Sequence, residues 1–271
     1  MMRTIVHLSD IHFGSIDPLT VTPLIRAVRE AAPDVVVVSG DLTQRAKPSQ
    51  FNDARNFLAQ LPSPQVVVPG NHDIPLYNFV TRFVRPLDNY RRYISNNLEP
   101  YYADREIAVL GINTARSLAF KNGRISQRQI GHVRDRFCPL DDRMVKILVT
   151  HHPVDLPREF AGLEVVGRAG RLMDVLAYCN ADMLLAGHYH ISHTGDTTTR
   201  YPIPSYSALV VHAGTATSVR GRGELNAFNV IRTEQSFVNI DRHVWQRDIA
   251  TFQLLRQERF QRTEEGWISL K

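Results

Sequence analysis

The run from Asp34 to Asp41, with four consecutive valines before a serine, a glycine and the final aspartate, constrains the fold more than any other stretch. Valines without polar alternation are typical of a strand buried on both faces, as in the interior of an α/β sheet. Asp41 then stands at the carboxyl edge of that strand. Ligands of open α/β sheets bind at this edge, because the loops diverge there and leave a crevice. We therefore expect chemistry at Asp41.

The chain has 271 residues, of which 43% are hydrophobic, and this fits one large globular domain or two small ones; we expect a single domain over 1–271. The sequence has no apolar run of about 18 residues, the length needed to span a bilayer. Met1 leads directly into a predicted strand, without the apolar core of a signal peptide. Cys138 and Cys179 lack the clustered spacing of a disulfide framework or a thiolate metal site, so we expect buried, reduced thiols. These features predict a cytoplasmic protein that does not engage membranes.

The formal charge of +5 favours anionic substrates, but it is well short of a nucleic-acid-binding composition. The eleven histidines are more informative. Imidazole is the commonest metal ligand, and several histidines follow directly after predicted strands. Ligand spacing is therefore the pattern to look for.

Hydrophobic periodicity predicts an α/β order for most of the chain. Helices are expected over 23–31, 51–61, 126–137 and 170–179, and strands over 3–8, 34–41, 66–68, 107–112, 145–150 and 183–186. Strands without intervening helices follow over 207–212, 227–231, 237–244 and 251–255, which indicates an antiparallel end to the sheets. Residues 74–104 are expected to form helical pieces of a cap or a dimer surface, and 242–271 a C-terminal extension.

Polar side chains recur where the predicted strands end. They are Asp10, His12, Asp41, Asn71, His72, His151, His188 and His190, from five separate segments. Because residues two apart in an extended chain point the same way, Asp10 and His12 can reach one ion. Carboxylate, imidazole and carboxamide donors without thiolates suit manganese, iron, zinc or cobalt. The sequence therefore predicts a site for two metal ions, electropositive enough to attract phosphate.

The ordered blocks Asp-x-His, Gly-Asp, Gly-Asn-His, His and Gly-His-x-His resemble those of the calcineurin-like metallophosphoesterase superfamily, over roughly Ile5 to His190. The resemblance implies a four-layer sandwich of two mixed β-sheets flanked by helices, with a dinuclear site at the carboxyl ends of the strands. It implies that Asp10, His12, Asp41 and His190 hold one divalent or mixed-valence ion, and that Asp41, Asn71, His151 and His188 hold the other. A hydroxide bridging the two ions would then attack the phosphorus.

By the same resemblance His72 is a catalytic residue rather than a ligand. It is expected to donate a hydrogen bond to the phosphate or a proton to the leaving oxygen, with Asp73 orienting its ring. Substrate contacts are also expected from Asn71 and from the loop arginines Arg45, Arg116, Arg220 and Arg222, although such arginines are often only solvated.

The remaining histidines favour structural roles. His152 is expected to orient His151 or to turn the chain before Pro153. His7, His132 and His243 are expected to be structural or solvated, whereas His193 and His212 are candidates for a place near the site.

Within the superfamily the chain looks most like the bacterial class III cyclic-nucleotide phosphodiesterases, which implies hydrolysis of 3′,5′-cyclic nucleotides such as cAMP. The alternatives are a broad phosphodiesterase for glycerophosphodiesters, a nuclease and a lipid-precursor pyrophosphatase; the last commonly has arginine where this chain has His72. A protein-binding scaffold is the non-enzyme alternative. The expected partner is a small phosphodiester rather than nucleic acid, and two chains are expected to be able to pair.

Overall fold

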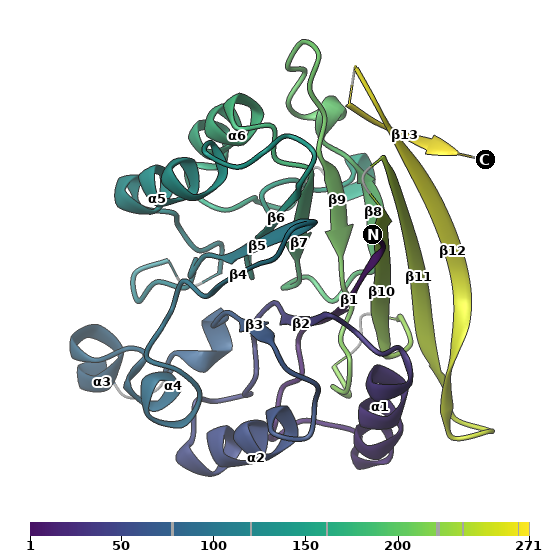
Figure 1. Cartoon of the computed structure of the whole chain (residues 1–271). Coiled ribbons are helices and arrows are strands. Elements are labelled where there is room, and N and C mark those ends of the chain that lie inside the picture. Colours follow the sequence, from purple (N-terminus) through teal and green to yellow (C-terminus); the bar gives the residue numbers. More distant parts are fainter. Residues whose placement is uncertain are drawn as a thin grey trace.

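Two mixed β-sheets face each other in the computed structural model, which describes residues 1–76, 79–119, 121–160, 162–220, 223–234, 236–264 and 266–270 (Figure 1). In spatial order the first sheet contains β13 (Gly266–Leu270), β12 (Thr251–Thr263), β11 (Phe237–Gln246), β10 (Ala227–Glu234), β1 (Arg3–Leu8), β2 (Val35–Val38) and β3 (Gln65–Val67). The second contains β4 (Tyr101–Ala103), β5 (Ile107–Gly111), β6 (Val145–Val149), β7 (Met183–Ala186), β9 (Leu209–His212) and β8 (His193–Asp196).

Parallel strands form one end of the first sheet and the middle of the second. β1, β2 and β3 pair in parallel, as do β5, β6, β7 and β9, while β10 to β13 continue the first sheet antiparallel. The expected antiparallel end is confirmed for β10, β11 and β12, whereas the strand expected over 207–212 is β9, which pairs in parallel with β7 in the second sheet. The expected C-terminal extension contributes β12 and β13 to the first sheet, and the expected cap stretch contributes β4, which pairs with β5.

Helices cover the outer faces of both sheets (Figure 1). They are α1 (Pro18–Glu30), α2 (Pro48–Leu58), α3 (Phe79–Val84), α4 (Asp88–Tyr93), α5 (Gln127–Phe137) and α6 (Ala169–Tyr178), with short 3₁₀ turns at Asn71–Asp73, Arg158–Phe160 and Thr197–Thr199. Residues 77 and 78 of the expected cap stretch lie outside the described residues. α1 begins earlier than predicted, because Asp17 caps it through the amide of Leu19, and Pro23 lies inside it rather than in its first turn.

The valine strand is buried on both faces, as predicted. Val35 and Val37 pack into the apolar layer between the two sheets, while Val36 and Val38 face the layer beneath α1 and α2. All four side chains are at most 1% exposed. Because these side chains are held on both sides, the carboxyl end of β2 is a rigid platform for Asp41.

The prediction of reduced thiols was wrong. Cys138 and Cys179 form a disulfide, with Cα atoms 4.4 Å apart and 41 residues apart in sequence. Each cysteine follows the last turn of a helix, α5 or α6, and the two helices pack on the same sheet. Sequence spacing does not reveal such a pair, because only tertiary packing brings the two helix ends together.

Reduction of this disulfide is expected to lower the free energy of unfolding by roughly 2–4 kcal/mol, since it releases a long closed loop in the unfolded chain. Thermal unfolding with and without reductant measures the effect. A Cys138→Ser, Cys179→Ser double variant should have the melting temperature of the reduced protein, and reductant should not change it. An unchanged melting temperature on reduction would show that the bond adds nothing to stability.

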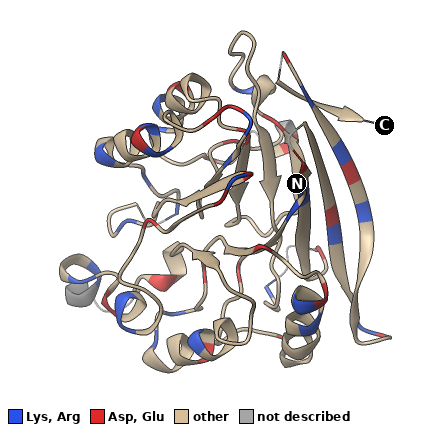
Figure 2. Ribbon diagram, viewed as in Figure 1, with Lys and Arg blue, Asp and Glu red and all other residues tan. Residues whose placement is uncertain are grey.

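Charges are interspersed on the surface. In Figure 2 the basic residues are spread over the outer helices and β12, with acidic residues among them. Among the described residues no helix is long and apolar enough to cross a bilayer.

Candidate metal centre

The seven expected metal ligands lie together where strands of both sheets end. Asp10 and His12 follow β1, Asp41 follows β2, Asn71 follows β3, His151 follows β6, and His188 and His190 follow β7. Parallel strands end at the same edge, so the packing of the two sheets brings five separate segments to one place. The sequence pattern thus predicts their convergence correctly.

Left-handed backbone directs most of these side chains into the site. The φ angles are 52° at Asp10, 56° at His12, 51° at Asp41, 78° at His188 and 57° at His190. Residues other than glycine seldom adopt this conformation, and such strain accumulates at functional sites. Each strand therefore ends in an abrupt change of direction that presents its side chain to the centre.

Two glycines make room for the ligands. A Cβ atom on Gly40, whose φ is +97°, would come within 2.6 Å of the His151 Nδ1 atom. A Cβ on Gly70 would come within 2.1 Å of the Asp41 Oδ1 atom. Glycine is thus required before Asp41 because His151 approaches closely, and before Asn71 because Asp41 approaches closely.

One cluster of donor atoms surrounds His12. Its Nε2 lies 3.0 Å from the Nε2 of His190 and 3.6 Å from both Asp10 Oδ1 and Asp41 Oδ2. The Nε2 of His190 lies 3.2 Å from Asp10 Oδ1. Because the Nδ1–H of His190 donates to the carbonyl of Arg220 at 3.0 Å, the lone pair of the neutral ring is on Nε2, which faces the cluster.

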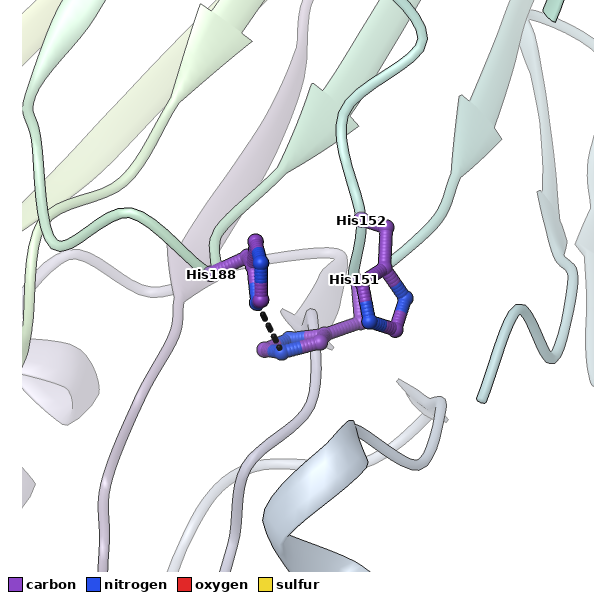
Figure 3. A group of neighbouring side chains, drawn as sticks. All are labelled: His151, His152 and His188. Carbon is purple, nitrogen blue, oxygen red and sulfur yellow. Dashed lines mark hydrogen bonds between the residues drawn. The ribbon is translucent and has the colours of Figure 1, made fainter. Parts of the chain in front are cut away.

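A second cluster shares Asp41 with the first. The Nε2 of His151 lies 3.4 Å from Asp41 Oδ2 and 3.1 Å from Asn71 Oδ1. The Nδ1 of His188 lies 3.1 Å from the same Asn71 oxygen and 3.3 Å from the Nε2 of His151, the contact dashed in Figure 3. His151 donates its Nδ1–H to the carbonyl of Ser39 at 2.8 Å, so its Nε2 also presents a lone pair.

These clusters have the chemistry of cation sites. Carboxylate oxygens and imidazole nitrogens face each other at 3.0–3.6 Å, and the buried Asp10 Oδ1 has no hydrogen-bond partner in the described part of the chain. Such an arrangement is repulsive unless positive charge occupies it. Nitrogen and oxygen donors of this kind suit borderline divalent ions. The residues present therefore fit two metal ions, one in each cluster.

The local electrostatics agree with this function. Burial opposes the ionisation of Asp41, but His151 and His72 nearby hold its pKa well below the usual value. Asp10 behaves in the same way, with its pKa lowered chiefly by His190 and then His12 against the effect of burial. Burial and the neighbouring His151 lower the pKa of His188 to about 3, which keeps its imidazole in the neutral, metal-binding form.

His72 adjoins this site, but the expected role of Asp73 was wrong. The His72 Nδ1 donates to the backbone carbonyl of Gln44 at 3.0 Å, which leaves Nε2 available to a substrate. The Asp73 carboxylate instead accepts hydrogen bonds from the amides of Leu42, Thr43 and Gly70. The 3₁₀ turn directs the Asp73 carboxylate back to these amides. Asp73 therefore stabilises the loop after β2 and forms no hydrogen bond with the His72 ring.

A cavity of about 490 Å³ opens onto the site. Its described lining residues are Asp41, Asn71, His72, Lys121, Asn122, Gly162, Leu163, Glu164, His188, Tyr189, His190 and Arg220. Arg220 thus lies where a substrate contact was expected. Arg45 and Arg116 are not among these residues, and Arg222 lies outside the described part of the chain. The Arg116 guanidinium donates to the carbonyls of Asn113 and Ala115 and to Gln129, which turns it away from the cavity.

Lys121, Asn122 and Glu164 are cavity residues that sequence reasoning missed. They lie in loops without periodicity, between β5 and α5 and between the second 3₁₀ turn and α6. Glu164 follows β6, whose end carries the expected ligand His151, but Lys121 and Asn122 follow β5, whose end carries none, so no sequence signal marked them.

The other histidines fall outside the two ligand sets. His7 pairs with the Ser39 hydroxyl, His132 with Glu99, and the ring of His243 stacks on Phe228, in agreement with structural roles. His193 and His212 were candidates for a place near the site; they face each other across β8 and β9, with ring centroids 6.1 Å apart. Neither is among the grouped metal donors of the described chain.

Fold and site together define a metallophosphoesterase. The family model of calcineurin-like phosphoesterases matches residues 3–192, and the chain belongs to this family. The solved purple acid phosphatase PPD1 from yellow lupin seeds superposes with a TM-score of 0.73 and 11% identity, covering 96% of this chain and 53% of that one. This likeness confirms the fold of two mixed sheets flanked by helices.

Two curated proteins with similar sequences are named as phosphodiesterases. The chain is 27% identical over 261 residues to a cAMP/cGMP dual specificity phosphodiesterase of Mycobacterium tuberculosis, covering 84% of this chain and 74% of the relative. It is 26% identical over 163 residues to a probable glycerophosphodiester phosphodiesterase of Arcobacter nitrofigilis, covering 58% of this chain and 57% of the relative. The chain thus matches little more than half the length of this second relative.

Proposed function

We propose that this protein is a dinuclear-metal-dependent phosphodiester hydrolase that cleaves 3′,5′-cyclic nucleotides such as cAMP. The observation that carries the proposal is the convergence of two donor clusters on one Asp41 oxygen, 3.4 Å from His151 Nε2 and 3.6 Å from His12 Nε2. Asp41 would therefore contribute to the binding of both ions, and a pair of neighbouring ions would supply the chemistry used for in-line displacement at phosphorus.

The ligand sets proposed from the family pattern agree with the clusters. Asp10, His12, Asp41 and His190 hold one ion, and Asp41, Asn71, His151 and His188 hold the other. When bound, the ions supply Lewis-acid activation of phosphate and of the attacking water. Manganese, iron, zinc and cobalt all suit these donors.

The protein's own groups then complete the reaction. His72, held through Nδ1 by the Gln44 carbonyl, presents Nε2 to the phosphate or to the leaving oxygen. Arg220 lines the same cavity, and its guanidinium is positioned by the Gln44 side chain, with Nη1 3.2 Å from Oε1. A guanidinium there opposes the negative charge of the phosphoryl group. Gln44 therefore positions both substrate-facing groups.

Cyclic nucleotides are favoured by the relatives and by the cavity. The relative that covers 84% of this chain is named for cAMP and cGMP. A cavity of about 490 Å³ is in the size range of small-ligand sites. Glycerophosphodiesters are the second candidate, because the Arcobacter relative is named for them. We do not favour the nuclease, pyrophosphatase and scaffold alternatives, since they lack comparable support and the donor set is intact.

The substrate proposal is tested by stripping the protein of metal, restoring manganese, and measuring hydrolysis of 3′,5′-cyclic AMP, glycerophosphocholine and an aryl phosphodiester. Turnover of cyclic AMP and of the aryl diester, lost in Asn71→Ala, is expected. Cleavage of glycerophosphocholine but not of cyclic AMP would contradict the cyclic-nucleotide substrate and favour glycerophosphodiesters instead. Absence of all three activities from protein holding two metals would contradict it.

Arg220→Gln is expected to raise KM for cyclic AMP about tenfold, because one charge-assisted hydrogen bond to phosphate contributes roughly 1.5–3 kcal/mol when buried and less in an open cavity. Steady-state kinetics measure the change, with Arg116→Gln as the control that keeps wild-type KM. Equal effects of the two variants would remove Arg220 from the substrate site.

A further inference from the structure

His152 is a buried imidazole beside the second cluster with no role so far. Its side chain is 0% exposed, and its ring centroid lies 4.6 Å from that of His188 and 4.9 Å from that of His151. Figure 3 shows the three rings grouped where β6 and β7 end. A ring nitrogen of each lies within 4.8 Å of one in both others.

The ligand imidazoles are not oriented in the same way. His151 and His190 each donate their non-ligand nitrogen to a backbone carbonyl, at 2.8 Å and 3.0 Å. Such hydrogen bonds usually fix the ring of a metal-binding histidine. His188 directs Nδ1 to the site, and no described residue accepts a hydrogen bond from its Nε2. The Nδ1 of His12 also lacks a hydrogen-bond partner in the described chain, so for these two rings packing is the support that the described residues offer.

Ring packing is the interaction available to His188. Tyr189 contacts the His188 ring with centroids 4.5 Å apart, and His152 contacts it at 4.6 Å and an interplanar angle of 50°. Because Tyr189 is the next residue in the chain, it follows any movement of the same loop. His152 comes from a different strand end and provides an independent support.

The loop after β5 fixes His152 in turn. The Thr114 hydroxyl lies 2.7 Å from the His152 Nδ1 and accepts the His152 amide at 3.3 Å. A Cβ atom on Gly123 would come within 2.4 Å of that Nδ1, so the bare glycine leaves space for the ring. Thr114 thus fixes the His152 ring by a hydrogen bond, and Gly123 leaves the space that the ring occupies.

We propose that His152 is a positioning residue of the second metal site, which orients His188 by ring packing where the usual hydrogen bond is missing. The inference rests on the proposed dinuclear site, but not on the substrate. Loss of the ring should lower metal affinity at the second site and leave the first site unchanged. An aromatic ring of similar shape should restore it.

Calorimetric titration of metal-stripped protein with manganese tests this proposal. His152→Ala is expected to weaken one of the two binding steps 10- to 100-fold, as removal of supporting groups around metal ligands does, and to leave the other unchanged. His152→Phe should recover most of the affinity. His212→Ala is the matched control: this histidine is also buried, at 3% exposure, but is outside the grouped donors of the described chain.

Three results would overturn the proposal: wild-type affinity in His152→Ala, an equal loss in His212→Ala, or no recovery in a folded His152→Phe variant, which would assign the effect to a nitrogen of His152. If His152→Ala does not fold, Thr114→Val removes only the hydrogen-bond partner of the ring and should weaken one binding step by a smaller factor. Because the readout is metal binding, failure to hydrolyse cyclic AMP leaves this test valid.

Discussion

Replacing Asp41 by asparagine is expected to abolish hydrolysis and to release both metal ions. One Asp41 oxygen lies in both donor clusters, and the pKa of this buried carboxyl is held well below its usual value, so the substitution removes a negative charge shared by both sites. Loss of the several kcal/mol that metal ions contribute to the transition state corresponds to a decrease in kcat/KM of about a thousandfold or more.

Metal content and kcat/KM measured on the same Asp41→Asn sample check this result. Asp182→Asn is the matched control: Asp182 is another carboxylate that is 1% exposed, and it pairs with Arg262 and the indole of Trp267 rather than with the donor clusters. The control should keep both ions. Two tightly bound ions and activity within tenfold of wild type in Asp41→Asn would contradict the shared-ligand arrangement.

Replacing His72 by phenylalanine is expected to lower kcat about 10²- to 10⁴-fold, the usual contribution of a general acid, while both metals stay bound. The His72 ring packs edge-on against His12, with centroids 4.9 Å apart, and phenylalanine preserves that contact without the nitrogens. The metal clusters do not include His72, so the loss should be confined to catalysis.

The leaving group decides which function His72 serves. If Nε2 protonates the leaving oxygen, the defect of His72→Phe should be large for cyclic AMP, whose alkoxide is a poor leaving group, and small for an aryl diester, whose phenolate leaves without a proton. Equal defects would assign His72 to phosphate binding instead. Loss of metal from the variant would show that His72 supports the ligands, against both roles.

The metal centre was predictable because its signals are local. Each buried strand can be recognised from runs such as Val35 to Val38, and each ligand follows a strand end directly. Parallel strands bring their carboxyl ends to one edge, so the proximity of Asp10 and Asp41 follows from the element order, whereas His151 belongs to the second sheet and joins them through the sandwich that the family resemblance implied. The strand-end positions therefore carried most of the information about the site.

The errors concern contacts between segments without a regular pattern. The Cys138–Cys179 bond depends on how α5 and α6 pack, and the orientation of Asp73 depends on amides of another loop. The short strands β4, β8 and β13 escaped prediction because three to five residues show little periodicity and are fixed by their neighbours in the sheet. Cavity residues such as Glu164 lie in loops whose course the sequence does not predict, because these loops have no regular periodicity.

The most direct test of the dinuclear account is to measure hydrolysis of the aryl phosphodiester as manganese is added to metal-stripped protein. The account predicts little activity up to one equivalent per chain and a steep rise that reaches its plateau at two, with Asn71→Ala remaining inactive throughout. Full activity at one equivalent, or activity unaffected by removal of metal, would contradict it.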